Sequence, residues 1–61
     1  MQAQDTERQT GYEKAAAGEA WSVNAGIGVM DDGAVRVATE REAAGVQDYW
    51  IEKGYMPRRR A

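Results

Sequence analysis

Few residues in this chain could do chemistry. Its 61 residues include no histidine and no cysteine, which excludes imidazole acid–base catalysis, cysteine nucleophiles and the usual ligands of zinc and iron–sulfur sites. The one serine, Ser22, has no nearby base that the sequence identifies as its partner. We therefore expect a protein that is not an enzyme and that holds no cofactor and no metal.

The two pairs of neighbouring carboxylates have simpler structural explanations. Asp31 and Asp32 precede a glycine, as turn residues do, and they lack the alternating oxygen ligands of a calcium loop. Glu40 and Glu42 follow Thr39 at a predicted helix start, where negative charge suits the helix dipole. We interpret both pairs as structural and not as acid–base sites.

Charge is divided unevenly along the chain. Residues 1–57 carry five basic and all ten acidic residues, a net charge of −5, and the tail Arg58-Arg59-Arg60 brings the total to −2. A body of negative sign repels phosphate, whereas an arginine tail can contact it. The tail is therefore the one feature that favours nucleic acid binding.

A β-hairpin over residues 26–39 is the centre of the predicted fold. β-Branched aliphatic residues recur there at every second position, as in half-buried strands. These residues are Ile27, Val29, Val35 and Val37. An isolated hairpin is marginally stable in water, so its apolar face needs a cover.

The length of the hairpin loop decides which side chains share a face. A three-residue loop, Asp31–Gly33, pairs Val29 with Val35 and gathers all four aliphatic residues on one face. A two-residue loop would pair Val29 with Arg36 and place a charge among the valines. We predict the three-residue loop.

The segment before the hairpin is predicted to be a helix. Thr10 and Glu13 have the spacing of a capping box, which indicates a helix over residues 11–24, after a flexible polar arm over residues 1–9. Trp21 points away from the weak apolar side of this helix, so it either packs back onto the hairpin or a second chain, or anchors a partner.

The segment after the hairpin is predicted to be a better-specified helix. Thr39 and Glu42 form a second capping box, and Gly54 is placed to end the helix after Lys53. The prediction is an α+β domain over residues 10–57 in the order α-β-β-α, followed by a basic tail over residues 58–61. We expect both helices to pack on one face of the hairpin through four apolar side chains: Val23, Val46, Trp50 and Ile51.

Composition and charge favour protein binding as the function. With no Leu, Phe or Cys in 61 residues the core is thin, which favours a homodimer or a stabilising partner. The leading hypothesis is a small acidic inhibitor or adaptor of phage or mobile-element type that blocks a nucleic-acid-handling complex, with carboxylates (Glu40 among them) standing in for phosphates. The candidate partner-binding residues are Trp21, Asp31, Asp32, Glu42, Asp48, Glu52, Tyr55, Arg58, Arg59 and Arg60.

Two alternatives stay open. A dimeric nucleic-acid-binding accessory or regulatory protein would use Arg58, Arg59 and Arg60. A structural subunit of an assembly would dock through Trp21 and the segment Tyr55-Met56-Pro57. No apolar run is long enough to span a bilayer, and we expect a cytoplasmic protein.

Overall fold

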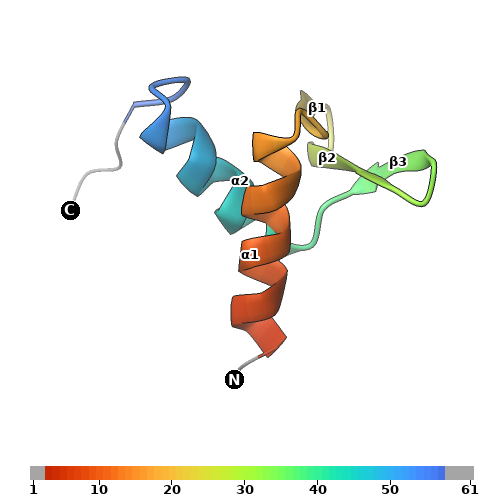
Figure 1. Ribbon diagram of the computed structural model, residues 1–61. Coiled ribbons are helices and arrows are strands. Elements are labelled where there is room, and N and C mark those ends of the chain that lie inside the picture. The colour runs from red at the N-terminus through yellow and green to blue at the C-terminus, as the bar shows by residue number, and fades with distance from the viewer. Residues whose placement is uncertain (1–2, 58–61) are drawn as a thin grey trace.

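Five elements follow one another along residues 3–57, the part of the chain that the computed structural model describes (Figure 1). In chain order they are α1 (Ala3–Ala16), β1 (Ala20–Val23), β2 (Gly26–Asp31), β3 (Ala34–Val37) and α2 (Glu40–Glu52). The strands form one antiparallel sheet in the order β1-β2-β3. The predicted α+β class, with helices packed against the strands, is confirmed, and the order gains a strand to become α-β-β-β-α.

The added strand β1 occupies the second half of the predicted first helix. Helix α1 ends at Ala16, and the φ of +76° at Gly18 lets the Glu19 N–H donate to the Lys14 carbonyl at 2.8 Å in a Schellman cap. Trp21 and Val23 then favour a strand, as aromatic and β-branched residues do. The predicted helix over 11–24 is therefore wrong in its bounds.

Helix α1 also starts earlier than predicted. Residues 3–9, expected in a polar arm, lie inside it, and the Thr10–Glu13 pattern falls within the helix instead of capping it. The alanines and charged residues of this segment are adequate helix formers, but the segment has almost no apolar periodicity. Its helical structure therefore depends on packing against α2, which the sequence does not reveal.

Helix α2 begins and ends where the sequence predicts. The Thr39 side chain accepts the Glu42 N–H at 3.2 Å, and the Thr39 N–H donates to Glu42 Oε1 at 3.0 Å, so both halves of the capping box are present. At the other end Gly54 has φ +81°, and the Tyr55 N–H donates to the Trp50 carbonyl at 2.7 Å. This Schellman cap ends the helix.

The β2–β3 hairpin turns through two residues, so the predicted three-residue loop is wrong. Both turn residues have positive φ, 51° at Asp32 and 82° at Gly33, as in a type I′ turn. That turn favours Asp-Gly because its twist matches the twist of paired strands. Val29 consequently lies opposite Arg36, and Met30 lies opposite Val35.

This register sends the aliphatic residues of the hairpin to opposite faces of the sheet. Ile27 and Val29 point toward the helices and are 8% and 0% exposed, whereas Val35 and Val37 point away and are 54% and 55% exposed. The expected gathering of all four on one face is therefore wrong. Arg36 takes the inward place because Glu42 pairs with it there.

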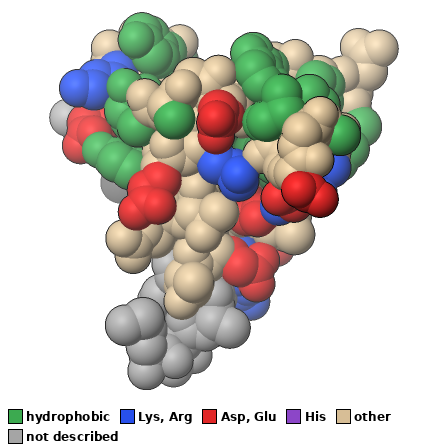
Figure 2. Space-filling view, turned by 45° about the vertical axis from the view of Figure 1, so that its right-hand side comes forward, with side chains coloured by type: hydrophobic (Ala, Val, Ile, Leu, Met, Phe, Trp, Pro, Cys, Tyr) green, Lys and Arg blue, Asp and Glu red, His purple; other side chains and the backbone are tan. Residues whose placement is uncertain are grey.

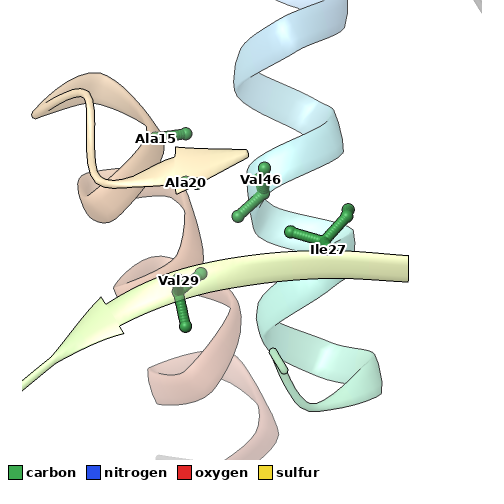
Figure 3. Close-up of a cluster of buried hydrophobic side chains, with 5 residues drawn as sticks. All are labelled: Ala15, Ala20, Ile27, Val29 and Val46. Atoms are coloured by element: carbon green, nitrogen blue, oxygen red, sulfur yellow. The ribbon is translucent and has the colours of Figure 1, made fainter. Parts of the chain in front are cut away.

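The core lies between the sheet and the two helices and is small. Figure 3 shows its five buried side chains converging from α1, β1, β2 and α2: Ala15, Ala20, Ile27, Val29 and Val46. Of the predicted helix–hairpin contacts, Val46 is fully buried and Trp50 packs against the cluster. Ile51 is half-buried, and Val23 is 39% exposed on the opposite face, so its predicted role is wrong.

Helices α1 and α2 cross with their backbones in contact at two glycines. A Cβ atom on Gly11 would lie 1.9 Å from the Glu42 carbonyl oxygen, and one on Gly45 would lie 1.8 Å from the Arg8 carbonyl oxygen. Neither distance is possible for real atoms, so only glycine fits at either position. The crossing brings α1 close enough to α2 to cover the sheet with short side chains.

Candidate interaction face

The outward side of the sheet carries four of the five large hydrophobic side chains that are exposed among the described residues. Because side chains alternate along a strand, every second residue of the three strands points away from the helices. We call this surface the open face and define it by five side chains: Trp21, Val23, Met30, Val35 and Val37. Met30 is half-buried, and the other four are 39–55% exposed.

Gly28 lies in the middle of the open face and lets its neighbours close over it. A Cβ atom there would lie 3.1 Å from Cγ1 of both Val23 and Val35, so these two valines lean over the glycine from the strands on either side. Gly28 is buried as a result. The apolar surface therefore continues across all three strands without a gap.

The open face has no charged side chain among its five defining residues. The charged residues of the hairpin strands, Asp31 and Arg36, point to the helix side. In Figure 2 hydrophobic side chains gather on the right of the view, where the hairpin comes forward, and acidic and basic side chains separate them from a second hydrophobic group at the upper left. When an antiparallel sheet is covered on one face, the other face is usually polar and in contact with water. The outer face of this sheet is apolar instead.

The hairpin is held in this orientation by an ion pair on the helix side. Arg36 Nη1 and Nη2 donate to the two carboxylate oxygens of Glu42 at 2.7 and 2.9 Å, and Arg36 Nε donates to Asp31 Oδ2 at 2.7 Å. A two-pronged arginine–carboxylate contact fixes direction as well as distance. It ties β3 to α2 and β2 at one point.

Among the described residues Glu42 is the one charged side chain that is buried. It is 6% exposed and also accepts the Thr39 N–H. The hydrogen bonds from Arg36, opposed in part by burial and assisted by Thr39, lower the pKa of Glu42 to about 2. The hydrogen bonds that Arg36 makes to Glu42 and to Asp31 raise the pKa of Arg36. The hydrogen bond from Arg36 also lowers the pKa of Asp31. The network stays fully charged at neutral pH.

The sequence-predicted site residues do not form one site. Trp21 belongs to the open face, where it is 40% exposed. Asp31 is paired with Arg36, Asp32 occupies the turn, and Glu42 is buried. Of these carboxylates, Glu42 has no free oxygen with which to imitate a phosphate.

The remaining predicted residues lie on the helices or beyond the described chain. Asp48 of α2 accepts from Arg8 of α1 at 2.7 Å, and Glu52 accepts from the Tyr12 hydroxyl, a bond that raises the pKa of Tyr12. Tyr55 is 70% exposed, and its ring centroid lies 6.4 Å from that of Tyr49. The three tail arginines, Arg58, Arg59 and Arg60, lie outside the described residues.

The open face consists mostly of residues that sequence reasoning did not select. The sequence prediction places Val23 in a helix and Met30 in a strand with no role. It places Val35 and Val37 on the apolar face of the hairpin, as part of the core. The signal that could have found them is the Asp32-Gly33 dipeptide, because a type I′ turn fixes the register that turns Val35 outward. If Gly18 is taken as the signal that ends the first helix, the segment with Val23 is predicted to be a strand, because β-branched residues favour strands.

No protein-family model matches this chain, and no significant similarity to a curated protein or a solved structure was found. Within residues 3–57 there is no pocket, and no group of three or more acidic side chains is arranged to hold a metal ion. Neither described helix is long and apolar enough to cross a membrane.

Proposed function

We propose that this protein works by binding another protein through the open face of its sheet. The observation that supports the proposal is the reversal of polarity in the hairpin, where valines face water and an arginine faces the helices. Exposed apolar patches on small soluble domains mark interaction sites more often than single exposed side chains do. Trp21 supplies the aromatic anchor that such surfaces favour.

The acidic surface has a smaller part in this proposal than the sequence suggested. Asp31, Glu42, Asp48 and Glu52 are each engaged by a side chain of the same molecule, so a partner would have to break those contacts to use them. The negative charge of the body favours basic partners through long-range attraction. An inhibitor or adaptor of a nucleic-acid-handling complex, of phage or mobile-element type, remains our prediction for its biological role.

Affinity capture with matched variants tests the proposal. Tagged wild type, Trp21→Ala and Tyr55→Ala are incubated with extract from the source cell at moderate salt, and retained proteins are quantified by mass spectrometry. Tyr55→Ala is the control because it truncates an exposed aromatic side chain far from the open face. We expect one protein set to be retained by wild type and Tyr55→Ala and to be reduced at least about tenfold by Trp21→Ala.

Circular dichroism melting of the three proteins separates lost contact from lost folding. Equal melting temperatures assign the loss to the open face. Retention of no protein by the wild type, or equal retention by all three, contradicts the proposal. A gel shift with DNA and RNA at low salt, abolished by deleting Arg58–Arg60, would instead support the nucleic-acid alternative.

A further inference from the structure

Strand β3 is an edge of the sheet, and its outward backbone groups can be identified. The Ala38 N–H donates to the Ile27 carbonyl at 2.7 Å, and hydrogen-bonded pairs alternate along an antiparallel ladder. Ala34, Arg36 and Ala38 therefore bond to β2. The N–H and C=O groups of Val35 and Val37 point away from the sheet, toward any strand that comes alongside.

This edge lacks the devices that keep strands from pairing. Natural edges are protected by prolines, bulges or charged side chains, and β3 has the sequence Ala-Val-Arg-Val with its arginine held on the helix side by Glu42. On the opposite edge β1 turns the backbones of Ala20 and Ser22 outward, and Ala20 is 9% exposed, so only part of that edge is open. Val35 and Val37, the outward residues of β3, are 54% and 55% exposed, so β3 is the more accessible edge.

We propose that a second copy of this chain pairs antiparallel along β3, about a two-fold axis through Val35. Antiparallel pairing of identical strands is isologous, so every contact occurs twice. An axis perpendicular to the sheet leaves both open faces on the same side. The result is one continuous sheet with twice the strands and one joined apolar surface.

The register follows from the side chains and hydrogen bonds of β3. An axis at Arg36 would place two arginines directly opposite each other, which is unfavourable. An axis at Val37 would require the Thr39 N–H, which is already donated to Glu42 Oε1 at 3.0 Å. With the axis at Val35, Arg36 lies opposite Ala34 of the second copy. The Val37 carbonyl accepts from Arg36 Nη1 at 3.4 Å and keeps a second lone pair for the new strand.

The dimer also enlarges the apolar area that a partner can contact. Three strands spaced by about 4.8 Å, with four residues of about 3.3 Å each, cover on the order of 200 Å². A standard protein–protein interface buries about 800 Å² per partner. One open face is therefore small for a stable complex, and joining two doubles what a partner can contact.

Solution mass with two variants at one position tests the pairing. Val35→Pro removes the outward N–H without removing a bond to β2, and Val35→Thr keeps that N–H and the β-branched shape. Analytical ultracentrifugation over a dilution series from millimolar to low micromolar should show dimers for wild type and Val35→Thr and monomers for Val35→Pro. A monomeric wild type throughout, or a dimeric Val35→Pro, overturns the proposal.

Hydrogen exchange on the wild type gives a test that does not depend on how the proline variant folds. The Val35 amide should exchange more slowly at high than at low protein concentration, and by a larger factor than the Val29 amide, which is already bonded inside the sheet. Concentration-independent exchange at Val35 overturns the proposal. Both measurements are made without a partner, and Trp21 lies on the other edge strand, so the outcome is separate from that of the capture experiment.

Discussion

The two faces of the sheet show opposite arrangements of the same residue types. On the covered face Val29 is fully buried beside an arginine whose charge is satisfied by Glu42. On the open face Val35 and Val37 are more than half exposed and have no charged neighbour within the defined set. The difference shows that alternation in a sequence identifies two faces of a strand but does not say which of them is covered.

The turn and the ion pair together determine that choice. A type I′ turn at Asp32-Gly33 fixes a register that brings Arg36 inward. Turning an arginine toward the covered face costs free energy unless it is paired, and the rigid start of α2 presents Glu42 at the necessary place. The valines of β3 then face outward as a consequence of the register.

Separating the two helices should destabilise the covered face most. In Gly45→Ala the new methyl group would overlap the Arg8 carbonyl, so α1 must move away from α2 and the core opens. We expect a loss of about 3 kcal/mol in unfolding free energy, which is much of the stability of a domain this small. Urea denaturation followed by circular dichroism measures it.

Glu13→Ala, on the exposed side of α1, is the control for changing a helix residue to alanine. It should shift the unfolding free energy by no more than about 0.5 kcal/mol. A Gly45→Ala variant as stable as the control would mean that the helices do not cross at the glycines.

The same truncation on the two faces should give different results. Val29→Ala removes two buried methyl groups and leaves a cavity, so we expect a loss of about 2.5 kcal/mol. Val35→Ala removes methyl groups that are already in contact with water, and we expect a loss of about 0.5 kcal/mol. Comparable losses at dilutions where the protein is monomeric would show that the open face is covered within a single chain.

Removing the carboxylate that holds Arg36 should cause the next largest loss of stability. Glu42→Gln keeps the shape but loses the charge–charge contact, and because Arg36 is partly solvated we expect a loss of about 1.5 kcal/mol at pH 7. Glu40→Gln, exposed in the same helical turn, is the control and should cost about 0.5 kcal/mol or less.

The pH dependence of stability reports the same ion pair. The pKa of Glu42 in the folded protein, about 2, is below its value of 4.5 when unfolded, so the stabilisation is complete above pH 4.5 and is lost as the pH falls toward 2. Asp31, whose pKa is also lowered, acts in the same direction. In that window Glu42→Gln should lose less stability than wild type, and equal acid sensitivity would contradict the pairing.

The ion pair between Arg8 and Asp48 should matter least. Their side chains are 57% and 38% exposed, and exposed pairs contribute little because water and salt screen them. Asp48→Asn should change the unfolding free energy by about 0.5 kcal/mol or less. A larger loss, measured by the same urea denaturation, would mean that the two helices rely on this contact instead of on their glycines.

Local signals in the sequence predicted the local parts of the fold. The capping box of Thr39 and Glu42 and the stop at Gly54 depend on residues within one helical turn, and both were predicted correctly. The hairpin was also found, from alternation alone. Its register was not, because the cost of turning Arg36 inward is offset by Glu42, which lies on a different element.

The open face could not be derived from the sequence for a related reason. It requires β1, where Ala20, like the three alanines over residues 15–17, is a strong helix former and favours a continuing helix. It also requires the outward placement of Val35 and Val37. Trp21 was selected as a candidate anchor on its own, and only the structure places it beside the valines of the other strands.

One nuclear magnetic resonance measurement tests most directly whether the valines of β3 face outward. Residues opposite each other in a pair that is not hydrogen-bonded have Cα atoms about 4.5 Å apart, and their Hα protons are closer still. The structure pairs Met30 with Val35 in this way, so we expect a strong Hα–Hα Overhauser effect between these two residues. Its absence, with Val29 found opposite Val35 instead, would show a three-residue loop with the valines turned inward and would contradict the open face.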